Sequence, residues 1–337
     1  MPGKILKEKC NCRSGRKRIT VFTPAYNRAG VIAALYHSLQ RQTFRDFEWI
    51  VVDDGSSDST EILFDQWLQE ENGFPILYIK QENGGKHRAI NQGLQKACGE
   101  LFFIVDSDDY LSDDALMTID KMEKSIPVSE RHAFIGICGL RAHFDKSPLG
   151  SSFEGDFLDI TYLEREKYNI RGDKAEAFYT ELLKKYPFPE FPNEKFVTEC
   201  IVWDRIAGDG FKFRYFNGIL LFCEYRTDGL SKNIENAFIR SPRGYALYLV
   251  QSREYQRFDE KQFFESCFNY YSELHHALSL RTMKEYLDIP YARLLGIVIR
   301  FHALRVLYHL YMSLPSPVHD LYRRLRDKTG VGFRPVK

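Results

Sequence analysis

Three carboxylates follow a short apolar run in the first third of the chain. The run 101–105, LFFIV, has the length and composition of a buried strand. The polar residues that follow it are Asp106, Ser107, Asp108 and Asp109. Three negative charges so close together repel one another unless water or a cation separates them, and oxygen ligands at a strand end suit Mg²⁺ or Mn²⁺. The pattern predicts a divalent-cation site. The alternative is an acidic turn that caps the next helix through Ser112 or Asp113.

Polar or glycine-rich segments also follow three earlier apolar runs. These runs, at 18–23, 47–52 and 75–79, are separated by helical patterns at 30–42, 59–71 and 86–98. Strands that alternate with helices of this length predict a parallel sheet, whose carboxyl ends meet at one edge. The chain lacks both the G-x-G-x-x-G and the G-x-x-x-x-G-K-[ST] motifs. The sequence therefore predicts a nucleotide site in which a metal ion, rather than a glycine loop, handles the phosphates.

The composition is that of an ordinary globular protein with basic ends. The chain has 337 residues, of which 44% are hydrophobic and 28% charged, and its net charge of +1 gives no reason to expect a nucleic-acid partner. Residues 1–18 carry seven Lys or Arg against one Glu, and residues 289–337 carry nine against two Asp. Such ends suit contact with anionic lipid or with a phosphorylated partner, and solvated tails are the alternative.

The cysteines and the N-terminus indicate a reducing compartment. Seven scattered cysteines form no disulfide framework, and Cys10 with Cys12 lacks the second ligand pair of a zinc site. No apolar segment follows the basic N-terminus, so no signal peptide is expected. A cytoplasmic location follows from these observations.

Four motifs together resemble a known enzyme family. TPAYNR, WIVVDDGSSDST, NGGKHRAINQG and VDSDDYL, in this order, resemble glycosyltransferase family 2 with its GT-A fold. The resemblance is strong over 19–111 and weaker over 171–231, where the chain is similar to a bacterial branch that serves surface-polysaccharide assembly. It implies an α/β fold, with a mixed nucleotide-binding sheet flanked by helices. It also implies a metal-dependent, inverting transfer from a nucleotide sugar, with a UDP-sugar as the expected donor and Mn²⁺ or Mg²⁺ as cofactor.

The expected organisation has three parts. A basic tail covers 1–18, a GT-A domain covers 19–235, and a mainly helical region covers 236–337. Within the GT-A domain, 19–111 is the nucleotide-binding half and 112–235 the acceptor and catalytic half.

The resemblance implies a set of donor-binding residues. They are Thr23, Ala25, Tyr26, Arg28, Asp53, Gly85, Lys86, Asp106, Ser107 and Arg226. Within this set Asp53 pairs with the uracil edge and Tyr26 offers a stacking face, although Asp53 could instead cap a helix through its Asp-Gly turn. Asp108 is the expected direct metal ligand, and Asp106 contacts the ribose, the metal or a metal-bound water.

A general base must come from a later segment. Glu199 resembles the family's catalytic carboxylate, although Thr198 precedes it where a Glu-Asp pair is usual. Its apolar neighbours would raise its pKa by desolvation, as a base requires. The alternative is a helix glutamate paired with Arg205, and Asp173 is the rival base. Trp203 either stacks on an acceptor sugar or belongs to the core.

The C-terminal region suggests a partner surface. Segment 294–312 is nearly apolar, but its Arg and His residues argue against a membrane-spanning helix. It is either packed in the fold or in a homo-oligomer interface, or it lies on an anionic membrane. Membrane contact would suit a glycan or lipid-linked acceptor. The alternative functions are a polyprenyl-phosphate sugar transferase and an inactive nucleotide-sugar-binding protein.

Overall fold

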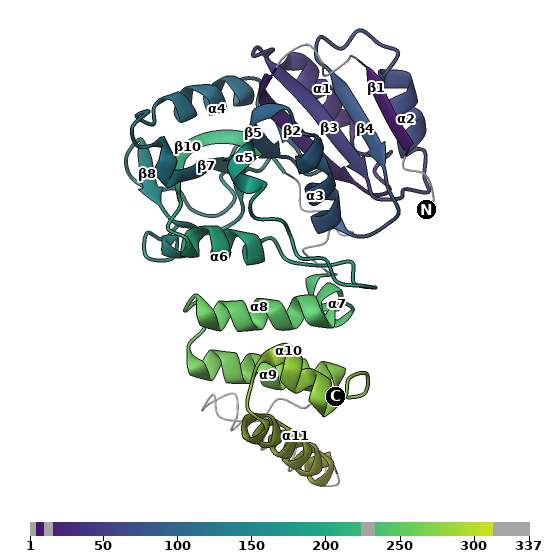
Figure 1. The fold of residues 1–337 in the computed structure, drawn as a ribbon, viewed down its shortest axis with the longest axis vertical. Helices are drawn as coiled ribbons and strands as arrows, with labels where there is room; N and C mark the ends of the chain where they lie inside the picture. The colour runs from purple at the N-terminus through teal and green to yellow at the C-terminus, as the bar shows by residue number, and fades with distance from the viewer. Residues whose placement is uncertain (1–4, 10–15, 224–232, 313–337) are drawn as a thin grey trace. The chain divides into compact units, whose positions relative to one another are not determined.

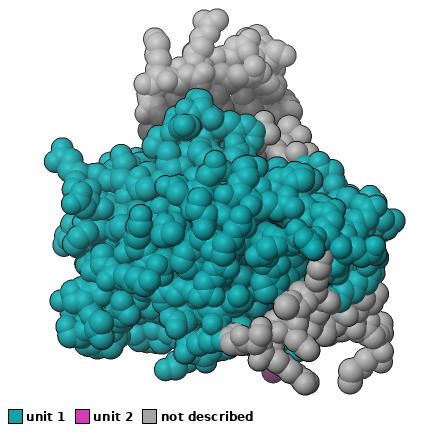
Figure 2. All heavy atoms as spheres, turned by 90° about the horizontal axis from the view of Figure 1, so that it is seen from above, with its two compact units in different colours: residues 1–244 teal, residues 245–337 magenta. Residues whose placement is uncertain are grey.

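The structure is a computed structural model that describes residues 5–9, 16–223 and 233–312. The chain divides into two compact units, Met1–Gly244 and Tyr245–Lys337, which are coloured separately in Figure 2. Arg226 and the basic residues after 312 lie outside the described residues.

A parallel sheet forms the centre of the first unit. Its strands are β2 (Lys17–Ala25), β3 (Phe47–Asp53), β4 (Ile76–Lys80) and β5 (Gly99–Ile104). They pair in parallel in the order β4-β3-β2-β5 (Figure 1). Every residue of β3 is buried, as expected of a parallel strand that is covered on both faces. The predicted α/β fold is confirmed.

Helices cover the two faces of this sheet. The connecting helices are α1 (Ala33–Arg41), α2 (Thr60–Trp67) and α3 (Lys86–Lys96). Val21 of β2 belongs to the core that includes α1 and α2, whereas Phe22 points to the opposite face and meets Gly93 of α3. A Cβ atom at Gly93 would lie 2.2 Å from the Phe22 ring. The missing side chain therefore lets α3 lie close to β2, and α3 begins with Lys86.

The second half of the first unit extends the sheet with strands of mixed direction. The strands are β6 (Tyr110–Leu111), β7 (Phe134–Ala142), β8 (Phe157–Ile160), β9 (Lys174–Tyr179) and β10 (Lys212–Phe222). The helices are α4 (Ala115–Lys124), η1 (Arg131–Ala133), η2 (Tyr162–Glu164), α5 (Thr180–Leu183) and α6 (Cys200–Gly208). Strand β9 lies antiparallel between β5 and β7. Its first residues therefore lie near the carboxyl end of β5, where the acidic segment begins.

One strand falls within the expected basic tail. β1 (Ile5–Lys9) pairs antiparallel with β4, and the ammonium of Lys7 contacts Glu61 at 2.8 Å and Asp65 at 2.6 Å. The edge of β4 offers unpaired backbone groups, and acidic side chains of α2 offer a partner for the lysine. Both contacts are long-range, so the local charge pattern does not reveal them.

Helices form the rest of the described chain. They are α7 (Ile234–Ile239), α8 (Pro242–Glu254), α9 (Glu260–Leu274), α10 (Leu280–Leu287) and α11 (Tyr291–Met312). Phe263, Met283 and Leu294 are fully buried within the second unit. In the part of the chain that the structure describes, no helix is long and apolar enough to cross a membrane.

Candidate active site

The loops after β3 and β4 are tied together by one buried carboxylate. Asp54 accepts hydrogen bonds from the backbone N–H groups of Gly84 (2.8 Å) and Gly85 (2.7 Å). The side chains of Gln81 and Asn83 donate to the same carboxylate. A buried carboxylate needs such donors, and the N–H groups before a helix need acceptors. Asp54 thus fixes the position of the Gly-Gly turn from which α3 starts.

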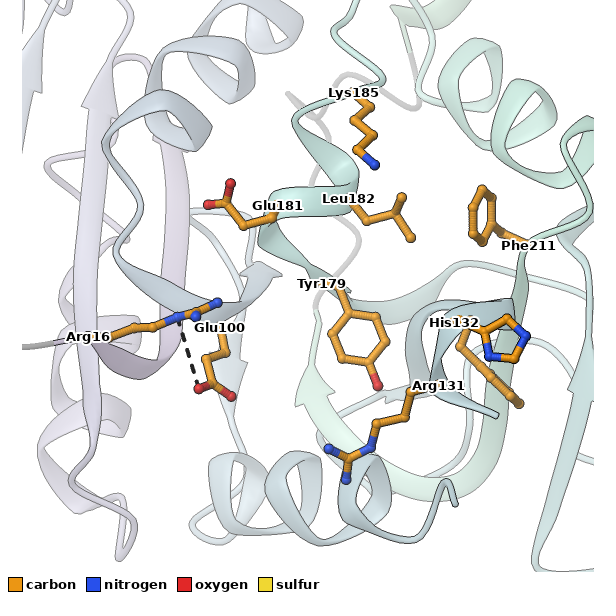
Figure 3. A pocket seen from close by; sticks show the side chains of 10 residues that line it. Arg16, Glu100, Arg131, His132, Tyr179, Glu181, Leu182, Lys185 and Phe211 are labelled. Atoms are coloured by element: carbon orange, nitrogen blue, oxygen red, sulfur yellow. Dashed lines mark ion pairs between the residues drawn. The ribbon is translucent and has the colours of Figure 1, made fainter. Parts of the chain in front are cut away.

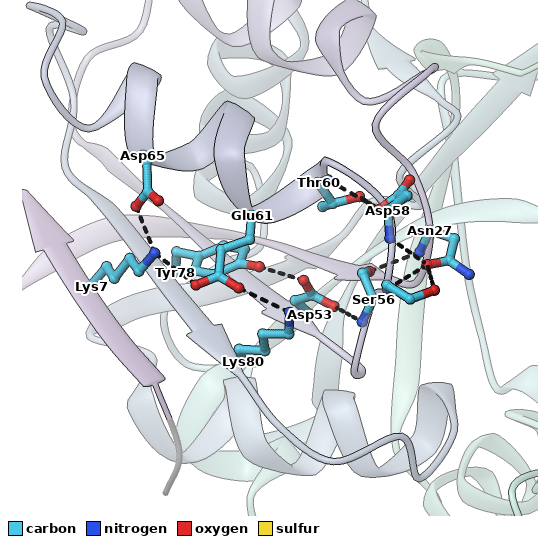
Figure 4. Close-up of polar contacts among 11 residues, drawn as sticks. Lys7, Asn27, Asp53, Ser56, Asp58, Thr60, Glu61, Asp65, Tyr78 and Lys80 are labelled. Carbon is cyan, nitrogen blue, oxygen red and sulfur yellow. Dashed lines mark hydrogen bonds and ion pairs between the residues drawn. The ribbon is translucent and has the colours of Figure 1, made fainter.

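Asp53 is fully buried beside Asp54, and its bonds are visible in Figure 4. One carboxylate oxygen accepts from the backbone N–H of Ser56 at 2.7 Å, and the other accepts from the hydroxyl of Tyr78. The carboxylate is held rigidly at the end of β3, and its pairing with a nucleobase stays a prediction. Tyr78 has no motif that marks it in the sequence.

The predicted residues after β2 lie in two different environments. Tyr26 is 48% exposed, so its ring offers a free face. Thr23 is fully buried, and its hydroxyl accepts a hydrogen bond from the indole N–H of Trp49 at 3.1 Å. The strand alternation points the Thr23 side chain into the core, and a role of this residue in lining the donor site stays a prediction. The other predicted residues of these loops are Ala25 and Ser107, which are buried, and Arg28, which is half-buried.

Two cations hold the acidic segment after β5. The Lys86 ammonium lies 2.5 Å from Asp106, and the Arg141 guanidinium lies 3.3 Å from Asp106 and 3.1 Å from Asp109. Burial by itself would raise the pKa of Asp106, but Lys86 and Arg141 outweigh it and hold the pKa well below its usual range. Burial raises the pKa of Asp109 despite Arg141. Arg141 comes from β7, and no motif near it predicts this contact.

Asp108 is the carboxylate of this segment that forms no ion pair with any cation among the described residues. It is half-buried and makes no hydrogen bond or ion pair with another described residue. Within residues 5–9, 16–223 and 233–312, no three Asp, Glu, His or Cys side chains are grouped to hold a metal by themselves. Mg²⁺ and Mn²⁺ are commonly bound by one or two carboxylates with substrate phosphates completing the shell. The donor set therefore fits a cation shared between Asp108 and a bound diphosphate.

Glu199 contacts the parallel half of the first unit through Lys86. It stands at the N-cap of α6, its side chain is 40% exposed, and its carboxylate lies 2.9 Å from the Lys86 ammonium. Lys86 therefore contacts both Asp106 and Glu199. Arg205, the alternative partner, donates instead to the carbonyl of Pro187.

The two predicted acceptor residues are placed differently. Trp203 is only 5% exposed, and its ring centroid lies 4.5 Å from that of Phe178. This packing against β9 fits the core alternative, and stacking of Trp203 on an acceptor sugar stays a prediction. Asp173 is exposed just before β9.

A second carboxylate, Glu176 of β9, lies near Glu199 and was not among the expected site residues. Its burial raises its pKa to about 7, with Glu199 and Asp173 adding to the shift and with Arg141 and Arg165 opposing it. The signal in the sequence is weak, since one glutamate among alternating residues of a strand is unremarkable. In the folded chain the charges of Asp173 and Glu199 therefore both act on Glu176.

The raised pKa of Glu176 makes stability depend on pH. A carboxyl group with a folded pKa above its unfolded value stabilises the fold below the unfolded pKa, and this contribution is lost as the pH rises to the folded pKa. Between about pH 4.5 and about pH 7 the free energy of unfolding of the unmodified protein should fall by about 2 kcal/mol because of Glu176. This figure is reduced to allow for the partial exposure of the side chain. Urea unfolding at several pH values should show that Glu176→Gln removes this loss. An equal pH dependence of stability in the unmodified protein and the variant would show that the pKa of Glu176 is not raised.

A pocket of about 540 Å³ lies at the opposite edge of the sheet (Figure 3). Its lining includes Arg16, just before β2, and Glu100, near the start of β5. The strands of the parallel sheet carry their polar loops at the other ends, so this pocket is separate from the site described above. It contains none of the residues predicted to bind the donor.

Known proteins resemble this chain in sequence. The profile of the family described as "Glycosyl transferase family 2" matches residues 20–149. The putative teichuronic acid biosynthesis glycosyltransferase TuaG of Bacillus subtilis is 34% identical over 211 residues, which are 62% of this chain and 78% of TuaG. The GalNAc(5)-diNAcBac-PP-undecaprenol beta-1,3-glucosyltransferase of Campylobacter jejuni is 26% identical over 262 residues, 75% of this chain and 80% of that enzyme. The glycosyltransferase GlyA of Streptococcus pneumoniae is 36% identical over 183 residues, 53% of this chain, but the chain spans only 26% of GlyA.

Solved structures share the fold. The S. aureus TarS 1–349 structure in complex with UDP-GlcNAc has a TM-score of 0.53 at 20% identity, and covers 83% of this chain and 79% of that one. The mannosyltransferase PcManGT from Pyrobaculum calidifontis, in complex with GDP-Man and Mn²⁺, has a TM-score of 0.50 at 18% identity. The match covers 96% of this chain and 83% of PcManGT. At these identities the likeness shows the fold alone, which is of the GT-A type. The family profile, the similarity to TuaG and the sheet together show that this chain belongs to glycosyltransferase family 2.

Proposed function

We propose that this chain transfers a sugar, with inversion, from a nucleotide sugar to a glycan or lipid-linked saccharide in bacterial cell-surface polysaccharide synthesis. A UDP-sugar is the first candidate donor, and Mn²⁺ or Mg²⁺ the cofactor. The names of the relatives support the product class, because TuaG is assigned to teichuronic acid biosynthesis and the Campylobacter enzyme to an undecaprenol-linked glycan. The TarS complex with UDP-GlcNAc and the mannosyltransferase complex with Mn²⁺ support the donor class and the cation.

One constellation carries the proposal. Asp106 and Asp108 follow β5, Lys86 begins α3, and Glu199 begins α6, so three elements meet where a diphosphate would lie. A lectin-like module has no need of such a carboxylate cluster. A scaffold that binds nucleotide sugars without turnover would not need Glu199 next to Lys86.

Each residue then has a chemical task. The acceptor hydroxyl attacks C1 of the donor sugar and its proton passes to a Glu199 carboxylate oxygen. The bond between C1 and the diphosphate oxygen breaks on the opposite face, and its electron pair leaves with the nucleoside diphosphate. Asp108 would hold the divalent cation, which would supply counter-charge for this leaving group. Asp53 and Tyr26 hold the nucleobase.

We propose that α11 provides peripheral contact with an anionic membrane, such as the inner face of the plasma membrane. Leu295, Ile299 and Val306 are 47%, 68% and 57% exposed, and their spacing places them on one face of the helix. Residues 291–312 contain three Arg and no Asp or Glu. Two of the arginines, Arg293 and Arg300, form ion pairs with Glu260 and Glu265 of α9. An exposed apolar stripe on a helix that contains no acidic residue suits an anionic lipid surface.

Removing the proposed metal ligand should abolish donor turnover. In a panel of nucleotide sugars with Mn²⁺, we expect slow, acceptor-free release of nucleoside diphosphate from one donor. Release should stop on chelation with EDTA and fall roughly 100-fold in Asp108→Asn, because the leaving group loses its counter-charge. Asp113→Asn, on an exposed carboxylate nearby, is the matched control. Unimpaired release by Asp108→Asn would sink the metal assignment.

The general base can be separated from its rival. With donor and acceptor, Glu199→Gln should lower kcat by about 100-fold or more with little change in the KM for the donor, because proton removal is lost. Asp173→Asn should keep most of the activity. The opposite ranking, measured in the same assay, would transfer the role of base to Asp173.

The membrane proposal is tested by vesicle co-sedimentation. The full chain should sediment with vesicles that contain phosphatidylglycerol and not with phosphatidylcholine alone, and Ile299→Asp with Val306→Asp should prevent it. Val128→Asp, at an 80% exposed valine of the first unit, is the control. A dimer seen by light scattering that the α11 substitutions dissociate, without lipid binding, would show instead that this face is an oligomer interface.

A further inference from the structure

The Lys86 ammonium is shared between the two halves of the site. It lies 2.5 Å from a carboxylate oxygen of Asp106 and 2.9 Å from one of Glu199. Asp106 belongs to the segment proposed to meet the diphosphate, whereas Glu199 is the proposed base. An ammonium group has three N–H donors, so these contacts occupy two of them. The group that neutralises the base is thus within reach of the donor's phosphates.

The local fold holds this arrangement in place. Gly85 has φ +99°, and a Cβ atom there would lie 1.9 Å from the backbone carbonyl oxygen of Lys195. Glycine therefore lets the segment before α6 lie directly against the turn before α3. The Lys195 ammonium also donates to the Asn83 side chain at 2.7 Å. The contact between Lys86 and Glu199 is therefore part of a packed junction.

The two carboxylates on Lys86 are not equally held. Asp106 also pairs with Arg141, which in turn donates to the backbone carbonyl of Lys174 at 2.9 Å. Within the described residues Glu199 has no other ion pair, and its side chain is 40% exposed against 26% for Asp106. Breaking the ion pair between Lys86 and Glu199 therefore costs less free energy than breaking the one between Lys86 and Asp106, because water can hydrate the more exposed Glu199 carboxylate.

We propose that Lys86 gates the base. While the donor site is empty, its ammonium holds a Glu199 carboxylate oxygen in an ion pair, so that this oxygen is not open to an acceptor hydroxyl. The donor's diphosphate then competes for the same ammonium, because phosphate oxygens are strong acceptors and the lysine head is a compact point charge. Glu199 becomes free to accept the acceptor proton only when the donor is bound. This inference rests on the proposed function and deepens it.

Competition for Lys86 predicts a change in the affinity for UDP that calorimetric titration can measure. If Glu199 and the diphosphate compete, then Glu199→Gln should release Lys86 and tighten binding of UDP, by about 3- to 10-fold in calorimetric titration with Mn²⁺. In a Lys86→Met background the same substitution should change UDP affinity less than about twofold. The pair of measurements forms a double-mutant cycle. Damage to the fold weakens binding, so a gain in affinity reports on the gate.

The alternatives give other results. Simple repulsion between Glu199 and the diphosphate would produce an equal or larger gain in the Lys86→Met background, and that result overturns the gate. No gain in Glu199→Gln overturns it as well. Asp113→Asn, which removes an exposed carboxylate that pairs with Arg41 and does not contact Lys86, should leave affinity unchanged. If the parent protein binds none of UDP, GDP and CDP, the proposed nucleotide site itself is refuted, which is a different failure.

Discussion

The register of the parallel strands is the constraint on which the site depends. Ala25 pairs with Asp53, and Asp53 pairs with Lys80, so the last residues of β2, β3 and β4 lie in one row. A shift of one residue would turn each side chain to the other face of the sheet. Because the apolar residues of these strands are buried on both faces, such a shift would expose core residues to water and carries a large cost. The loops after the strands can therefore vary in chemistry without losing their position.

Hydrogen bonds from protein groups hold the two carboxylates at the end of β3. Asp53 and Asp54 are both buried, and backbone N–H groups of the neighbouring loops donate to both of them. Hydrogen bonds to a charged group contribute about 1.5–3 kcal/mol each, which offsets part of the cost of burial. These bonds also stiffen the Gly-Gly turn, and the turn sets where Lys86 points. The position of the Lys86 charge therefore follows from the backbone geometry of this turn.

The second half of the unit supplies what the parallel sheet lacks. The antiparallel strand β9 brings Glu176 near the edge where β5 ends, and β7 brings Arg141 to Asp106 and Asp109. Without Arg141, the carboxylates at 106 and 109 would repel each other in a poorly solvated place. The α6 N-terminus then delivers Glu199 to Lys86 from the other side. The parallel half of the unit and the mixed half are joined by ion pairs as well as by the sheet.

Sequence by itself determined the parallel half of the fold. Apolar runs of strand length, helical periods between them and the four polar motifs are local patterns, and local patterns fix element type and order. They also placed Asp106, Asp108 and Lys86 at the same edge of the sheet, whereas Glu199 was implied by the family resemblance. The family resemblance added the reaction class, because the motifs that carry it are contiguous stretches of the chain.

Only the tertiary structure decided which side chains face the site and which face the core. Thr23 and Trp203 sit in chemically suggestive stretches, yet strand alternation and helix packing bury them. His87 lies beside Lys86 in the same motif, yet it is 1% exposed. Arg141 contacts Asp106 from a strand that no motif marks. The reason is physical: a residue's type is a local property, whereas its partners and its burial arise from segments far away in the chain that the packed sheet brings together.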